Sequence, residues 1–252
     1  MKSLSHYIQE KLVIKKNKAT NYKYFPKTKK ELQDIIKRRI EQDGDEVDLN
    51  DIDVSKITDM SVLFKGTNFN GDISLWDVSN VTNMYCMFYG CKSFNKNISD
   101  WDVSNVKNMY GMFYKCTNSN QDISQWDVSN VTDMGYMFFG CQCFDKDIST
   151  WNVSSVNNMK YMFCGCESFN QDISQWEVSN VTNMVGMFTD CHKFNQDISN
   201  WDVSNVTDMR YMFFWCKSFN QDISNWNVSN VINMDDIFYN CPIEEKYKLK
   251  FK

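Results

Sequence analysis

The stretch WDVSNVTNMYCMFYGCKSFN, residues 76–95, returns in six further close copies along a chain of 252 residues. The copies begin at Trp101, Trp126, Trp151, Trp176, Trp201 and Trp226. A fixed period of 25 residues is typical of units that cannot bury their own apolar faces and must stack on their neighbours. The sequence therefore predicts a stack of repeated units with one continuous core, in which Trp126 and Trp151 lie next to each other.

One unit, which begins at Ile98, contains two different spacings of apolar residues. Trp101 and Val103 alternate with polar residues, as in a short strand. Ser104 and Asn105 then supply turn chemistry. The apolar residues that follow have the spacing of one helical face: Met109, Met112, Phe113 and Cys116. We expect each unit to form a strand, a turn, about two helical turns and a return loop.

The frame Ile98-x-x-Trp101-x-Val103 matches the L-x-x-L-x-L frame of leucine-rich repeats. Together with the recurring QDIS segment, the full unit resembles the BspA-like leucine-rich repeat, a family found in bacterial surface proteins and in viral and phage genomes. The resemblance implies an α/β solenoid, a leucine-rich-repeat-like right-handed coil of eight units, with short parallel strands on one face and short helices on the other. It also implies adhesion or protein binding, and it offers no catalytic residues.

The repeats, residues 46–241, follow a basic segment, residues 1–45, that predicts a helical cap. Thr28 and Glu31 have the spacing of a capping box, and Asp43-Gly44 is a helix stop. The apolar stripe between them consists of Leu32, Ile35, Ile36 and Ile40. Residues 1–24 pair an amphipathic stretch with a basic linker, which fits either a separate docking peptide or a segment folded back onto the cap.

The last segment, residues 242–252, predicts a capping strand. Tyr247, Leu249 and Phe251 alternate with lysines, which gives one apolar and one charged face. Lysines on such a strand discourage the stack from joining end to end.

Charge and hydropathy exclude several classes of protein. Residues 1–45 hold 12 Lys and Arg against 6 Asp and Glu, whereas residues 46–252 hold 15 against 26. Nucleic-acid binding needs a basic face, and the large part of this chain is acidic. Because the chain has neither a long apolar run nor a charged start followed by an apolar stretch, we expect no membrane span and no signal peptide. The expected location is cytoplasmic or virion-associated, with no classical secretion.

Cysteine and histidine usage argues against an enzyme. Seven of the ten cysteines recur in the repeat, which favours a reduced compartment and buried thiols that pack as small hydrophobes. Two C-x-C pairs, Cys141 with Cys143 and Cys164 with Cys166, lack the spacing of a standard zinc site. His6 and His192 stand in different parts of the chain, so no catalytic triad recurs. We expect no enzymatic activity and no cofactor.

Acidic side chains form two columns when the units are aligned. One contains Asp77, Asp102, Asp127, Asn152, Glu177 and Asp202, and the other Asp122, Asp147, Asp172, Asp197 and Asp222. Stacked carboxylates need compensation, either from turn N–H groups or from calcium. Turn capping is the preferred interpretation, because asparagine replaces aspartate in the first column and accepts the same hydrogen bonds.

The positions that vary between units point to a binding surface. They are rich in aromatic residues, and Tyr, Trp and Arg dominate the energetics of protein interfaces. The candidate partner-binding residues are Tyr85, Tyr89, Tyr110, Tyr114, Tyr136, Phe139, Tyr161, Arg210, Tyr211, Phe214 and Trp215. Packing of these rings against adjacent units is the alternative. A polar, acidic face that includes Asp102 and Ser104 is a second candidate surface.

The expected function is therefore a non-enzymatic interaction scaffold, a monomer that binds a protein partner through these variable positions. A surface or virion-associated adhesin that recognises host glycans or proteins is the alternative. A glycan ligand fits only this second hypothesis.

Overall fold

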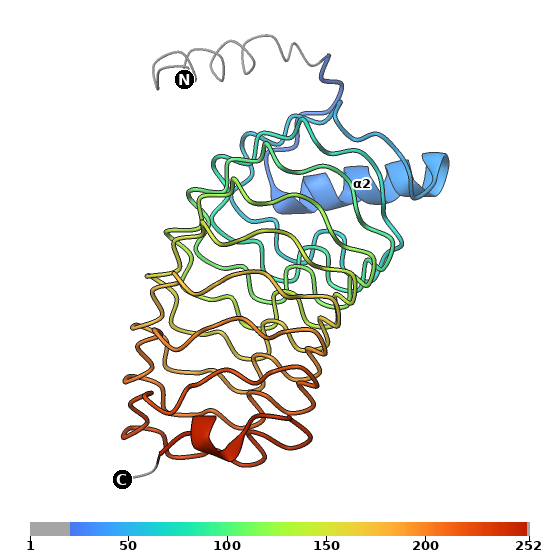
Figure 1. Ribbon diagram of the computed structural model, residues 1–252. Coiled ribbons are helices and arrows are strands. Elements are labelled where there is room, and N and C mark those ends of the chain that lie inside the picture. The colour runs from blue at the N-terminus through green and yellow to red at the C-terminus, as the bar shows by residue number, and fades with distance from the viewer. Residues whose placement is uncertain (1–20, 251–252) are drawn as a thin grey trace, which may run out of the picture.

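The computed structural model describes residues 21–250. Figure 1 shows the repeats as successive coils of the chain stacked from the N-terminal to the C-terminal end. Helix α2, Lys29–Asp43, lies across the N-terminal end, and the short 3-10 helix η1, Glu245–Tyr247, lies at the other end. The eight coils begin at Leu49, Ile73, Ile98, Ile123, Ile148, Ile173, Ile198 and Ile223.

The expected α/β solenoid with parallel strands and short helices is wrong. Within residues 21–250 the helices are α2 and η1, and neither lies in the repeats. Coils are joined by isolated parallel bridges of one residue each, such as Asn83 to Asn108, and not by strands. The capping strand at the C-terminus is also wrong in its described part, because η1 stands there and is followed by the buried Leu249.

The coils turn where a helix was expected because two residues per coil have left-handed backbone conformations. In the second coil these are Cys86, with φ of 51°, and Gly90, with φ of 76°. All the remaining coils also have positive φ at the same two places, four residues apart. A helix needs consecutive right-handed residues, so this pattern produces a series of tight turns. The apolar spacing of 3 and 4 is satisfied by turns as well as by a helix.

A row of four backbone hydrogen bonds links each coil to the next, and a further one runs the other way, as from Lys107 N–H to the Thr82 carbonyl. The N–H groups of Met84, Cys86, Phe88 and Gly90 donate to carbonyl oxygens at residues 108, 110, 112 and 114, over 2.7–2.9 Å. Intervening residues close turns inside the coil, as when Met87 N–H donates to the Met84 carbonyl. The four-bond pattern recurs at every junction from the first coil to the eighth, so the backbone of this segment is paired without a sheet.

Tryptophans form one column of the core. Their indole N–H groups link adjacent coils where strand pairing was expected. The seven repeat tryptophans are 3–4% exposed. Each indole N–H donates to the carbonyl of the residue that begins the preceding coil; for Trp151 this is the Ile123 carbonyl, at 3.1 Å. The Trp126 backbone N–H donates to that same carbonyl. Trp126 and Trp151 are therefore buried neighbours, as predicted.

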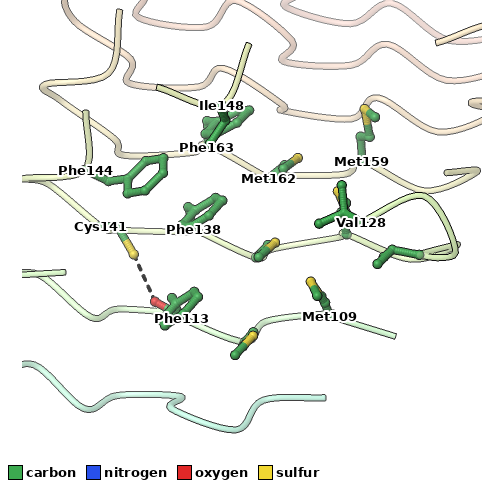
Figure 2. Close-up of a cluster of buried hydrophobic side chains, with 14 of the residues drawn as sticks. Met109, Phe113, Val128, Phe138, Cys141, Phe144, Ile148, Met159, Met162 and Phe163 are labelled. Carbon is green, nitrogen blue, oxygen red and sulfur yellow. Dashed lines mark hydrogen bonds between the residues drawn. The ribbon is translucent and has the colours of Figure 1, made fainter. Parts of the chain in front are cut away.

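Phenylalanines and cysteines form further columns (Figure 2). The rings of Phe113, Phe138 and Phe163 lie one above another, with centroids 5.7 Å apart. The Cys141 thiol donates to the Phe113 carbonyl over 2.9 Å, and the same bond recurs in most coils. Burial of the recurring cysteines in the core is thus confirmed, except at Cys241, which is half-buried.

Helix α2 confirms the predicted N-terminal cap. Thr28 is its N-cap, with a hydroxyl that accepts the Glu31 N–H, and Gly44 is its C-cap. The Glu31 carboxylate accepts the Lys27 N–H, one residue before the bond of a standard capping box. Leu32 and Ile36 are buried against the first coil, so the helix covers that end of the core.

The third coil contains a substitution inside the core. Ser119 stands where other coils place a phenylalanine such as Phe144 or Phe169, and it is 1% exposed. The Gln121 side chain turns inward beside it and accepts a hydrogen bond from the Ser119 hydroxyl. Within residues 21–250, the Gln121 amide nitrogen is buried without a hydrogen-bond partner. The coil thus fills the space of a missing ring with a polar side chain.

Candidate binding surface

The predicted partner-binding residues all lie on the consecutive turns of their coils. Most are half-buried, whereas Tyr85 and Trp215 are 39% and 37% exposed. Packing between adjacent units therefore accounts for part of each ring, and the remainder faces solvent. The packing interpretation therefore holds in part, and binding of a partner at these positions stays a prediction.

The rings of the second to fifth coils form one continuous group, which we call the aromatic patch: Tyr85, Tyr89, Tyr110, Tyr114, Tyr136, Phe139 and Tyr161. In its first row, centroids are 5.3 Å apart from Tyr85 to Tyr110 and from Tyr110 to Tyr136, and 5.0 Å from Tyr136 to Tyr161. In its second row, Tyr114 stacks on Tyr89 at 4.3 Å and on Phe139 at 4.6 Å. Because the faces are largely stacked on each other, the patch presents ring edges and tyrosine hydroxyls.

Glycines make room for this row of rings. A Cβ atom on Gly135 would lie 3.1 Å from the Tyr110 ring, and one on Gly186 would lie 2.2 Å from the Tyr161 ring. Gly186 also has φ of 57°, which favours glycine. The Tyr161 ring therefore closes over the backbone of the sixth coil, which ends the aromatic patch.

The remaining predicted residues form a second group, the C-terminal patch: Arg210, Tyr211, Phe214, Trp215 and, in addition, Tyr239. Phe214 makes an edge contact with Tyr211 at 5.9 Å and stacks on Tyr239 at 5.0 Å. Tyr239, which is 53% exposed, was not among the residues predicted from the sequence. The signal was present, because Tyr239 occupies the same place in the eighth coil as Phe214 in the seventh.

Lysines lie beside rings of both patches, although the chain as a whole is acidic. Lys65 lies 4.9 Å from the Tyr89 ring centroid, and Lys160 lies 5.5 Å from those of Tyr110 and Tyr136. Lys217 lies 5.5 Å from the Trp215 ring. Such cations are attracted to aromatic rings and leave positive charge at the rim of the patches. These lysines were not among the predicted residues, which apart from Arg210 are all aromatic.

Three tyrosines of the aromatic patch keep their hydroxyl protons. Burial raises the pKa of Tyr110 to about 12 and also raises the pKa of Tyr136 and Tyr161. Their hydroxyls are consequently available as hydrogen-bond donors at neutral pH.

The acidic columns act as turn caps. The Asp172 carboxylate accepts the Ser174 N–H at 2.9 Å, and Asp202 accepts that of Ser204 at 3.0 Å. These hydrogen bonds lower the pKa of both carboxyl groups. The preference for turn capping is confirmed at these positions, and Asn152 makes the same contact with Ser154. Across residues 21–250, no three His, Cys, Asp or Glu side chains gather as metal ligands.

Most of the thiols lie in the core, where burial disfavours the thiolate form. Burial raises the pKa of Cys91 to about 11 and of Cys164 to about 12. The Nε2 atom of His192 lies 3.7 Å from Asp190. His6 lies outside the described residues.

Thiol labelling checks the burial of the cysteines. Cys143 is the exposed member of the ten, and we expect it to react promptly with a thiol reagent at pH 8. The other thiols should react at least about 100-fold more slowly, because a raised pKa leaves little thiolate and burial blocks access. All ten should react once denaturant unfolds the chain. Prompt reaction of several thiols in the folded protein would contradict the packing described above.

The chain belongs to the family described as Mycoplasma protein of unknown function, DUF285, which matches residues 31–150 and 133–249. The two matches together span the repeats and helix α2 from residue 31 onward. No curated protein matches the chain. None of the helices in residues 21–250 combines the length and apolar character needed to span a membrane.

Proposed function

We propose that the protein is a non-enzymatic scaffold that binds a protein partner through the aromatic patch and the C-terminal patch. The observation that supports this most is the set of half-exposed rings with lysines at the rim, stacked over consecutive coils. Tyr, Trp and Arg supply large contact areas at low entropic cost and are enriched at interaction hot spots. The lysines favour a partner surface with acidic residues around an apolar centre.

Ring orientation favours a protein over a glycan. Sugars stack on the open faces of aromatic rings, whereas Tyr89, Tyr114 and Phe139 already have their faces stacked on one another. Ring edges and hydroxyls suit the mixed apolar and hydrogen-bonding contacts of a protein interface. A role as a displayed adhesin then requires a protein receptor at these patches.

We also propose that the repeat is related to the BspA-like leucine-rich repeat. The frame that Ile98, Trp101 and Val103 share with that repeat supports the relation, as do the QDIS segments. Adhesion to a host surface is the role that this relation suggests.

Affinity capture with matched variants tests the proposed function. The bait is the full chain, with bound proteins crosslinked and identified in the native host. A variant with Tyr211→Ala and Trp215→Ala should recover its partner at least about tenfold less, since hot-spot truncations cost about 2 kcal/mol or more. Phe25→Ala is the control, because Phe25 is 62% exposed at the other end of the chain. Equal recovery by all three baits would refute binding at the C-terminal patch, and a Tyr114→Ala bait tests the aromatic patch in the same way.

A further inference from the structure

The last coil has a row of backbone donors that the other coils have paired. In the seventh coil, N–H groups of Met209, Tyr211, Phe213 and Trp215 donate to carbonyls of the eighth coil over 2.8–3.0 Å. The corresponding groups of the eighth coil belong to Met234, Asp236, Phe238 and Asn240. Within residues 21–250, none of these four N–H groups has a backbone or side-chain acceptor. Alternate residues therefore present four unpaired donors in a line.

The side chains beside this row are also uncovered. Met209 and Phe213 are fully buried in the seventh coil, whereas their counterparts Met234 and Phe238 are half-buried. Ile232, next to the row, is 87% exposed, at a place where the preceding coils carry exposed polar residues such as Thr207. Water-facing apolar side chains beside unpaired N–H groups are the features of an edge that another chain can extend.

The chain's own C-terminal segment covers a different part of this end. The Tyr247 carbonyl accepts the Ile223 N–H at 3.1 Å, and Leu249 is buried. That contact seals the start of the eighth coil, beside the tryptophan column. It leaves the turns of residues 231–241 open on their outer side.

We propose that this open edge binds one further coil of the same repeat type, supplied by another polypeptide. At the seven junctions inside the stack, the row of donors is filled by carbonyls at alternate residues of a coil of this type, together with its apolar side chains. Charge adds selectivity, because Asp235 and Asp236 are exposed where the preceding coil has Arg210 and Tyr211. A docking coil with a basic residue at this place pairs its charge with Asp235. This surface is separate from the aromatic patch, and Tyr239 of the C-terminal patch lies within its turns.

A second copy of the chain fits this edge poorly. If two copies met through their eighth coils, the unpaired N–H groups of one copy would face those of the other, with no carbonyl to accept them. At the opposite end the carbonyls of Asp59 and Ser61 have no backbone donor among residues 21–250. Helix α2 lies beside them, with Lys29 Nζ bound to both of those side chains. Head-to-tail stacking, which would produce filaments, is therefore obstructed at the N-terminal end.

Amide hydrogen exchange on the full chain, resolved by residue, tests the proposal. The probe is a synthetic peptide of residues 201–215, one coil segment that carries Arg210 and the needed carbonyls. In the free protein, N–H groups of Met234, Asp236 and Phe238 should exchange fast, whereas that of Met209 is protected. Up to about 1 mM peptide should slow exchange at the open row by at least about tenfold. A peptide with the same residues in scrambled order should have no effect.

Charge reversal supplies the matched variant. Asp235→Lys with Asp236→Lys keeps the backbone donors, and lysine already occupies the first of these places at Lys160. The variant should keep the exchange pattern of the first seven coils and weaken protection by the peptide at least about threefold. Absence of protection in the wild-type chain would overturn the proposal, as would protection confined to the aromatic patch. Concentration-dependent self-association that protects the same row without peptide would overturn it in favour of a second copy.

Discussion

Replacing Trp151 with alanine is expected to lower the free energy of unfolding by about 3–5 kcal/mol. The indole is 3% exposed, its N–H donates to the Ile123 carbonyl, and its ring lies 6.5 Å from that of Trp176 and 6.3 Å from that of Phe138. Alanine leaves a cavity between two coils and removes one buried hydrogen bond. Urea denaturation followed by circular dichroism measures the loss as a lower midpoint.

Trp215→Ala is the matched control for this change. It removes the same side chain from the same kind of coil, but the ring is 37% exposed and borders solvent. We expect a change below about 1 kcal/mol. Trp151→Phe should fall between the two variants, since it keeps an aromatic ring and loses the N–H donor. Equal midpoints for Trp151→Ala and the wild type would contradict a core built on the tryptophan column.

The sequence predicts which residues are buried more reliably than how the backbone runs between them. A 25-residue period places Trp126 beside Trp151 in any stacked arrangement, because equivalent residues of adjacent units must meet. Helix α2 is predictable for a local reason, since Thr28 and Gly44 are strong start and stop signals. Both inferences depend on residue type and spacing alone.

The turns could not be predicted in this way, because the spacing of apolar residues is the same in these turns as in a helix. Left-handed conformations decide the matter, and non-glycine residues such as Tyr136 and Trp215 adopt them here. Glycines at the equivalent places, among them Gly111 and Gly140, were the available signal. The strand prediction failed because a side chain takes the role of strand pairing. The Trp101 indole N–H donates to the Ile73 carbonyl and so joins the two coils.

The sequence predicts which residues form the candidate surface, but not how far their side chains are exposed. Aligning the units identifies Tyr85 and Tyr110 as variable aromatic residues, but only the coil spacing stacks their rings 5.3 Å apart. The break at the sixth coil depends on Gly186, whose missing side chain admits the Tyr161 ring. Contacts of this kind require the three-dimensional arrangement.

Replacing Phe169 with serine should also cost about 3–5 kcal/mol, although the chain itself carries Ser119 at the equivalent place of another coil. Phe169 is fully buried, and its ring lies 4.2 Å from that of Phe163 and 6.0 Å from that of Phe194. In the third coil Gln121 fills the missing space. Gln171 can do so only by giving up its hydrogen bonds to the Asp145 side chain and carbonyl.

Two variants make the comparison quantitative by urea denaturation. Phe25→Ser removes a ring that is 62% exposed and should change the free energy of unfolding by less than about 1 kcal/mol. Ser119→Phe should stabilise the protein by about 1–2 kcal/mol, because it completes the ring column and releases the buried Gln121 amide to the surface. A loss below about 1 kcal/mol for Phe169→Ser would mean that the coils close around a missing ring, and the phenylalanine column would then not carry the core.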